Sequence, residues 1–191
     1  MQRSFKIEGV VISRKNLGEA DRLLTIYSKY NGKIVTIAKG IRRLHSRKAP
    51  HLELFAHVQV YITHGRTWDI ITEVVSIEKF VYLGSRLDRI AQAYAIVEQL
   101  DRLAPERETH KSIYFLLVET LKRIDNQKEQ DLESVVNEFT LNLLWELGFL
   151  PREKIIAGSS LDKFLEEVME KTLKSKILLT RLNKGNSQYY G

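Results

Sequence analysis

The densest positive charge in the chain lies in ten consecutive residues, and positive charge is what a polyphosphate ligand requires. The run from Lys39 to Lys48 contains five lysines and arginines and no acidic residue. Such side chains neutralise phosphates and release the counterions condensed on a nucleic acid. On a flexible loop they can follow the irregular backbone of a single strand. We expect nucleic-acid contacts from Lys39, Arg42, Arg43, Arg47 and Lys48. The alternative is a solvated loop whose charges only keep the protein in solution.

The net positive charge of the whole chain is confined to its first part. Residues 1–80 hold 14 lysines and arginines against seven acids, whereas the other 111 residues hold 16 against 17. Asymmetry of this kind indicates a polyanionic partner, either a nucleic acid or an anionic membrane surface. It favours the functional interpretation of the basic run over the solvated-loop alternative.

Aromatic side chains are interleaved with these charges and offer surfaces on which bases can stack. Stacking contributes roughly 1–3 kcal/mol per base. Most of the six aromatic residues in this region fall within apolar runs, so we expect them to fill a core and only one or two to stack. Tyr30, beside an Asn-Gly turn, and Trp68, close to Arg66, are the best placed. Arg14, Lys33 and Arg66 are further candidate DNA contacts.

The sequence offers no pattern typical of catalysis, of a metal site or of a cofactor site. It has no cysteine, and its five histidines show neither HxH nor HExxH spacing. The glycine motifs that cradle phosphates, GxxxxGK[ST] and GxGxxG, are also missing. Its paired acids, such as Glu166 and Glu167, have no nearby partner of the kind that catalysis uses. We expect no catalytic residue, no metal, no cofactor and no small-molecule substrate.

No apolar run approaches the roughly 18 residues of a membrane span. The stretch Met1–Gly9 mixes charged and apolar residues and lacks the apolar segment of a signal peptide. We therefore expect no membrane association and a cytoplasmic protein.

The apolar pattern changes period near residue 84, which predicts two structural parts. Before it, five short runs read as strands, with an Asn31-Gly32 hairpin and a second turn at His64-Gly65-Arg66. A five-stranded OB-fold barrel, which has no exposed edges, fits these runs and binds oligonucleotides. The runs span residues 5–12, 23–27, 34–38, 57–63 and 68–77.

After residue 84 the apolar residues recur three and four apart, as in amphipathic helices. Stripes run over 87–100, 113–124, 132–147 and 161–177, and four such helices would pack as a bundle. Gly148 and Pro151 predict the end of the third helix, and Ser159 or Ser160 an N-cap of the fourth. The fold class is therefore α+β, with an OB-fold domain at 1–82, a helical domain at 83–182 and a flexible tail at 183–191.

Several strings in the sequence resemble one known family. Gly9-Val10-Val11-Ile12 leads into Gly18-Glu19-Ala20-Asp21-Arg22-Leu23-Leu24-Thr25; Gly32-Lys33 and Ala38-Lys39-Gly40-Ile41-Arg42-Arg43 follow, then Ser46-Arg47 and, later, Leu147-Gly148-Phe149-Leu150-Pro151. In order and spacing they are similar to the signature of the bacterial RecO family of DNA repair proteins, over about residues 5–151. The segment 161–179 also looks like that family's closing helix.

The resemblance implies an N-terminal OB-fold, a helical domain and a non-enzymatic role in homologous recombination. Proteins of this family bind single- and double-stranded DNA and anneal complementary strands. They engage RecR and the acidic C-terminal tail of single-strand-binding protein, and they help to place RecA on coated DNA. It also implies that the basic residues at 39–48 lie on the DNA-contacting side of the barrel, in a bacterial, nucleoid-associated protein.

One departure from the family pattern concerns zinc. Many members insert a cysteine-rich zinc-binding subdomain after the Leu-Gly-Phe-x-Pro string, whereas fewer than ten residues separate Pro151 from the last predicted helix here. Functions that depend on that module are not implied for this chain.

Charge and barrel alone do not separate DNA from RNA, so an RNA- or ribosome-binding OB-fold protein is the second hypothesis. A metal-dependent nuclease is the third, and it would need clustered acids in the basic domain. For the helical domain we expect a groove for an acidic, apolar peptide, with Arg102, Lys122 and Arg123 as candidate rim residues.

Overall fold

The computed structural model describes residues 4–126, 128 and 131–171, and it contains the five predicted strands. They are β1 (Ser4–Leu17), β2 (Asp21–Ser28), β3 (Gly32–Ala38), β4 (His57–Thr63) and β5 (Asp69–Glu78). The alternation of apolar residues located each strand to within a few residues, except that β1 continues five residues beyond its predicted end. The two predicted turns are confirmed, since the chain reverses between Ser28 of β2 and Gly32 of β3, and β4 and β5 flank residues 64–68.

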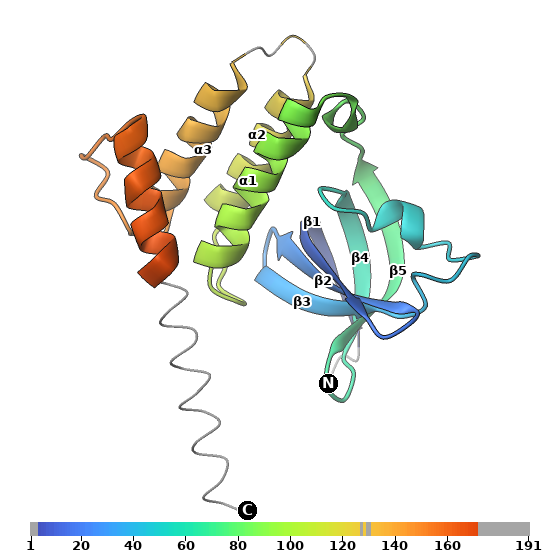
Figure 1. The fold of residues 1–191 in the computed structure, drawn as a ribbon. Coiled ribbons are helices and arrows are strands. Elements are labelled where there is room, and N and C mark those ends of the chain that lie inside the picture. The colour runs from blue at the N-terminus through green and yellow to red at the C-terminus, as the bar shows by residue number, and fades with distance from the viewer. Residues whose placement is uncertain (1–3, 127, 129–130, 172–191) are drawn as a thin grey trace, which may run out of the picture.

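The strands form a closed barrel in the order β1-β2-β3-β5-β4 (Figure 1). The long strand β1 serves two partners: its first half pairs with β4 over Ser4–Val10, and its second half pairs with β2 over Gly9–Leu17. A short parallel pairing of β3 with β5 closes the barrel, while all other pairs are antiparallel. This architecture confirms the predicted OB-fold.

The barrel interior is filled by aliphatic side chains from every strand. Residues that alternate along β1 and β2, such as Val11, Leu24 and Ile26, point into it and are fully buried. Ile41 and Leu52, from the segment between β3 and β4, complete this core. That segment is therefore fastened to the barrel near both of its ends.

Helices α1 (Leu87–Leu103), α2 (Lys111–Asp125) and α3 (Leu132–Glu146) follow the barrel, preceded by the short turn η2 (Leu83–Ser85). Residues 159–171 form a further helix, so that residue 159, a candidate N-cap, is already helical. Gly148 ends α3 as predicted, with φ of 74° and a bond from the Phe149 N–H to the Leu144 carbonyl. In the described part of the chain, no helix combines the length and the apolar character that crossing a membrane requires.

The predicted division at 82/83 falls in the connection between β5 and α1. The end of the predicted helical domain and the predicted tail, residues 172–191, lie outside the described residues.

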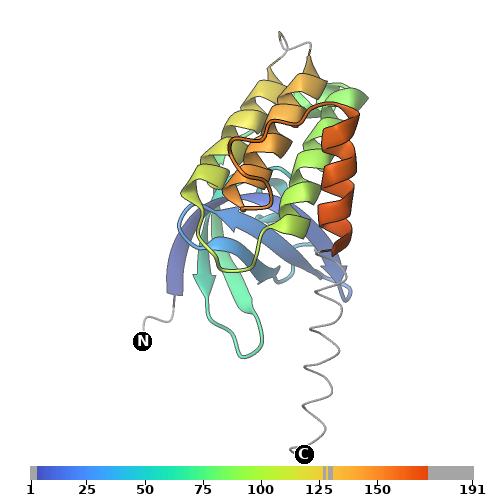
Figure 2. The same ribbon diagram turned by 90° about the vertical axis from the view of Figure 1, so that its left-hand side faces the viewer.

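The helices pack on the outer face of the barrel and share one core with it (Figure 2). Val10 and Ile12 of β1 and Tyr27 of β2 point out of the barrel and are buried among the side chains of α1, α2 and α3. Tyr27 is thus buried, as expected for most of the aromatic residues, but it belongs to the interface and not to the barrel interior.

A buried polar network links the same two parts. The Tyr114 hydroxyl of α2 donates to the Glu8 carboxylate at 2.7 Å and lies 2.7 Å from His57 Nε2. Because the tyrosine proton is given to Glu8, the histidine must donate from Nε2, which defines its neutral tautomer. Burial lowers the pKa of His57 against the opposing pull of the Glu8 and Glu78 carboxylates. The hydrogen bond from Tyr114, together with Lys29, lowers the pKa of Glu8 in spite of its partial burial.

Gly32 brings the β2–β3 turn against the α1–α2 connection. Its φ is 63°, and a Cβ atom at this position would lie 2.0 Å from the carbonyl oxygen of Glu108. No other residue type fits both the backbone conformation and this contact. The Asn-Gly turn therefore also sets how the helices approach the barrel.

Candidate nucleic-acid interface

The segment between β3 and β4, residues 39–56, first protrudes from the barrel away from the helices (Figure 1) and then returns toward α1, where Phe55 packs against Tyr94. We call it the basic loop. It consists of successive turns and one short 3-10 helix, η1 (Ala49–His51). Because Ile41 and Leu52 are buried in the barrel core, the residues between them are displayed at its end.

The base of the basic loop is bonded to the β1–β2 turn. The Gly40 N–H donates to Asp21 Oδ1 at 2.7 Å, and the Arg42 N–H donates to the Ala20 carbonyl at 2.9 Å. The guanidinium of Arg42 also donates to the carbonyl of Gly18, at 2.9 Å. Three bonds to one short turn fix where the loop leaves the barrel, and one of them also holds the side chain of Arg42.

Four of the five cations predicted in this loop are exposed, namely Lys39, Arg42, Arg43 and Arg47. The fifth, Lys48, is only half exposed, since its ammonium donates to the Ile71 carbonyl of β5 at 3.1 Å. Burial lowers the pKa of Lys48, and nearby Asp21 opposes that shift. The structure therefore gives Lys48 a role in holding the loop against β5. A hollow of about 590 Å³ lies beside the basic loop, lined by Lys39, Gly40, Arg43, Leu44, His45, Ser46, Arg47, Lys48 and Thr72.

Arg14 and Arg22 extend the positive charge from the loop onto β1 and β2. Both guanidinium groups contact the carboxylate of Glu53, with Arg22 at 3.0 Å. Burial, followed by the charges of Arg14 and Arg42, lowers the pKa of Arg22, so the three arginines lie within electrostatic range of one another. One carboxylate does not neutralise them. The basic surface thus comprises Arg14, Arg22, Lys39, Arg42, Arg43, Arg47 and Lys48.

Arg22 did not appear among the sequence-predicted contacts. It adjoins the apolar run at residues 23–27, where a single charge gives no signal of its own. Only the approach of β2 to the basic loop places it beside Arg42.

Tyr30, Arg66 and Trp68 lie away from the basic surface. Tyr30 precedes β3 and Lys39 follows it, so they stand at opposite ends of that strand, a span of roughly 20 Å for seven extended residues. Tyr30 is 58% exposed and Trp68 is 42% exposed, as base stacking requires. Arg66 and Trp68 lie in the exposed β4–β5 turn.

A second hollow, of about 420 Å³, lies beside Tyr30. We call it the Tyr30 pocket. The ammonium of Lys111 lies 4.7 Å from the centre of the tyrosine ring, and that of Lys29 lies 5.6 Å from it. Both cations are close enough for a cation–π contact. The pocket combines the barrel with the α1–α2 connection, and its lining residues are Phe5, Tyr30, Asn31, Ile34, His64, Arg107 and Thr109.

The prediction that Lys33 is a DNA contact needs correction. Only 4% of Lys33 is exposed, and its ammonium donates to the Asp101 carbonyl of α1 at 2.6 Å, with the Asp101 carboxylate 3.7 Å away. A lysine held in this way has no free face for a phosphate. Lys33 instead ties β3 to α1.

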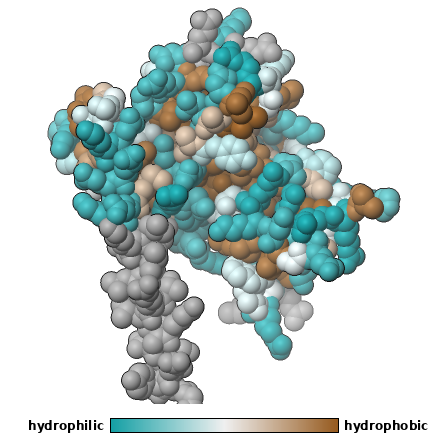
Figure 3. Space-filling view, viewed as in Figure 1, coloured by the Kyte–Doolittle hydropathy of each residue, from teal (hydrophilic) through white to brown (hydrophobic). Residues whose placement is uncertain are grey.

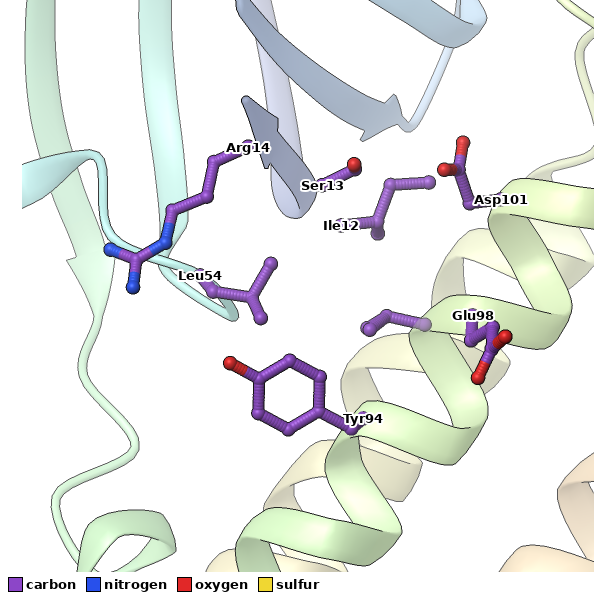
Figure 4. Close-up of a pocket in the computed structure, with 8 residues that line it drawn as sticks. Ile12, Ser13, Arg14, Leu54, Tyr94, Glu98 and Asp101 are labelled. Carbon is purple, nitrogen blue, oxygen red and sulfur yellow. The ribbon is translucent and has the colours of Figure 1, made fainter. Parts of the chain in front are cut away.

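A third hollow, of about 320 Å³, separates the barrel from α1 (Figure 4). Its floor is apolar, with Ile12, Leu54 and Tyr94. Figure 4 shows Arg14 on the barrel side, whereas Glu98 and Asp101 lie on α1. The two carboxylates disfavour an acidic peptide at this position.

The candidate rim residues of the predicted peptide groove do not come together. Arg102 pairs with Glu98 at 2.6 Å, Lys122 pairs with Glu78 at 3.3 Å, and Arg123 pairs with Glu138 at 2.7 Å. They belong to two helices, and each faces a carboxylate. The structure therefore does not gather them into one positively charged rim.

Comparison with known proteins agrees with the fold. The family model described as recombination protein O N terminal matches residues 1–80, and the one described as recombination protein O C terminal matches residues 84–154. The chain belongs to the RecO family.

Curated proteins with the name DNA repair protein RecO match most of this chain. It is 36% identical to the DNA repair protein RecO of Roseiflexus sp. over 78% of this chain and 52% of the relative. It is 33% identical to that of Symbiobacterium thermophilum over 77% of this chain and 58% of the relative. The chain thus spans little more than half the length of these RecO relatives.

The family strings can now be given structural roles. The Gly18 to Asp21 string forms the turn that supplies three acceptors to the basic loop, and the Ala38 to Arg43 string supplies the donors. Two of the strings that resemble the RecO signature therefore pair with each other to hold the base of the basic loop.

Proposed function

We propose that this chain binds single- and double-stranded DNA in repair and recombination, through the basic surface and without catalysing a reaction. The observation that carries the proposal is the support just described. Three hydrogen bonds and two buried aliphatic side chains hold a loop on which four exposed cations stand together. A loop whose charges served solubility alone would not need a fixed position.

The electrostatics of this surface favour a phosphate backbone. Among the seven cations of the basic surface, Arg14 and Arg22 share one carboxylate, and Lys48 is bonded to a carbonyl. The other four are exposed, and Arg42 is exposed although its guanidinium also donates to the Gly18 carbonyl. If each neutralises one phosphate of a single strand, log K should fall against log salt with a slope of about −2.8, lower in magnitude than the −3.5 expected for five.

Charge reversal tests the proposal. The variant Arg42→Glu, Arg43→Glu, Arg47→Glu should lose retention of an oligo(dT) strand in a gel-shift titration at moderate salt. The matched control is Lys128→Glu, Lys154→Glu, Lys163→Glu, which makes the same change in net charge at exposed positions of the helical part. Equal loss in both triple variants would indicate a general charge effect, and unchanged affinity in the first would refute the proposal.

The finer activities implied by the family are also proposals: annealing complementary strands, partnership with RecR and with the tail of single-strand-binding protein, and help in placing RecA. Family membership supports them. Calorimetry with a tail peptide tests the partner that has the simplest chemistry. If calorimetry detects no binding of the peptide, the chain is a plain DNA binder and not a recombination mediator.

An RNA- or ribosome-binding role is the second candidate, because the cations and exposed aromatic rings fit either nucleic acid. Competition between DNA and RNA oligomers of matched sequence distinguishes the two. A preference for RNA at equal length and salt would favour the second role.

A further inference from the structure

Leu44 lies in the middle of the basic loop and is 99% exposed, more than any other large apolar residue in the described part of the chain. Single exposed apolar residues are common and usually need no explanation. Leu44 differs in its neighbours, because Arg43 and His45 are adjacent to it in the sequence. Arg42 lies two residues before it and Arg47 three residues after it. In Figure 3 the outermost point of the protruding segment shows hydrophobic atoms among hydrophilic ones.

The position of Leu44 is fixed by the turns on both sides of it. The Arg43 N–H donates to the Gly40 carbonyl at 3.2 Å, and the Ser46 N–H donates to the Arg43 carbonyl at 3.0 Å. Below these turns, Ile41 is buried in the barrel core and Gly40 is bonded to Asp21. A side chain presented in this way can enter another molecule without first ordering a loose chain.

We propose that Leu44 is a wedge that inserts between neighbouring bases of the nucleic acid held by the flanking arginines. The inference rests on the proposed function, and it names the step that the basic surface would perform on DNA. Apolar side chains inserted at a base step unstack it and kink a duplex, while surrounding cations hold the phosphates on either side. The hollow beside Leu44, lined by Arg43 and Arg47, gives a displaced backbone room next to positive charge.

An exposed leucine among cations could contact either a base step or an anionic membrane. The size of its apolar surface favours the base step. One leucine offers far less apolar area than a lipid anchor or an amphipathic helix needs to hold a protein on a membrane. A base step, in contrast, accepts a single side chain. Opening a step in this way would give a strand-pairing protein access to bases that are otherwise stacked.

The test uses the full chain and a short duplex that carries 2-aminopurine, a base whose fluorescence rises when it is unstacked. The variant Leu44→Ala should fold as the wild type does, because the side chain has no contacts to lose. Wild type should raise the fluorescence on binding. Leu44→Ala should abolish the rise and weaken duplex binding about tenfold, with an unchanged salt slope, since no charge is removed.

Leu44→Phe is the conservative control and should keep the fluorescence rise. If Leu44→Ala matches wild type in both fluorescence and affinity, the wedge is wrong, even where the triple Arg→Glu variant has lost binding and the proposed function stands. If the triple variant binds normally, the proposed function itself fails. If Leu44→Ala instead loses binding to vesicles of anionic lipid and keeps duplex unstacking, the assigned occupant is wrong.

Discussion

Oδ1 of Asp21 accepts the backbone N–H of Gly40 at 2.7 Å, and this bond joins the β1–β2 turn to the first residues of the basic loop. An acidic residue so close to a proposed DNA surface is unexpected from charge alone. Its carboxylate repels phosphate, yet it holds the cations in position. Removing the Asp21 carboxylate should strengthen DNA binding if repulsion dominates and weaken it if the position of the loop dominates.

The variant Asp21→Ala should bind DNA more weakly than wild type, by about fivefold, although its net charge is one unit more positive. The reason is that a hydrogen bond to a charged acceptor, with a contribution of about 1 kcal/mol or more, no longer orders the loop. Fluorescence anisotropy with a labelled single strand measures the change. Asp21→Asn is the control, since its amide oxygen still accepts from Gly40. Tighter binding by Asp21→Ala would show that bulk charge, and not loop position, decides affinity.

The second prediction concerns Tyr30, which stands one strand length away from Lys39. Tyr30→Ala should weaken the binding of oligonucleotides long enough to reach the Tyr30 pocket by about fivefold or more, as expected for one lost stacking contact. Binding of very short oligonucleotides should not change. The slope of log K against log salt should also stay constant, because stacking releases no counterions. Tyr30→Phe keeps the ring and should behave as wild type. If Tyr30→Ala instead weakens the binding of oligonucleotides of every length equally, Tyr30 maintains the structure of the pocket and does not stack on a base.

Lys33 gives a prediction about stability and none about DNA. Lys33→Met keeps the aliphatic stem but leaves the Asp101 carbonyl without its donor, so the free energy of unfolding should fall by about 1–3 kcal/mol. Thermal unfolding followed by circular dichroism measures it. The exposed Lys39→Met is the matched control and should show the reverse pattern, with unchanged stability and weaker DNA binding. Loss of DNA affinity in folded Lys33→Met would contradict the conclusion that Lys33 only ties β3 to α1.

The fourth prediction follows from the lowered pKa of His57. Because burial keeps this ring neutral in the folded state, the unfolded chain takes up its proton first as the pH falls. Stability should therefore be constant above about pH 6.5 and should decline below it, until the folded ring titrates as well. The lowered pKa of Glu8 adds a second loss below about pH 4.3. Urea unfolding at a series of pH values measures both steps.

Two variants separate these steps. His57→Gln has no titrating ring and should abolish the first decline. Tyr114→Phe removes the hydrogen bond that contributes most to the lowered pKa of Glu8, so the folded pKa should approach the unfolded one and the second loss should become smaller. A first decline that persists in His57→Gln would assign it to another group.

The apolar runs were sufficient to predict the barrel, because every strand turns alternate residues into its core, although β2 and β3 are also buried on part of their outer face. The helices were predicted for the corresponding reason. Lys33 was assigned wrongly because its partner lies 68 residues further along the chain, on a helix whose docking no local pattern describes. Tyr27 looked like barrel core for the same reason.

The basic loop illustrates what charge alone can and cannot predict. Its cations were visible as a run, but whether each one faces solvent depends on contacts with β5 and β1. Lys48 is drawn onto the Ile71 carbonyl, whereas Arg22 joins the surface from a strand. Leu44 carried no signal within the run, since a leucine at that position is read from the sequence as one more loop residue.

The core that the barrel shares with the helices also limits how the protein can be divided. Val10, Ile12 and Tyr27 would face water in a fragment cut at residue 82, and such a fragment would be prone to aggregate. The two halves that differ so sharply in charge and in secondary structure should therefore melt together in one cooperative transition. A ligand that binds the helices would, by the same linkage, stabilise the barrel and its basic loop.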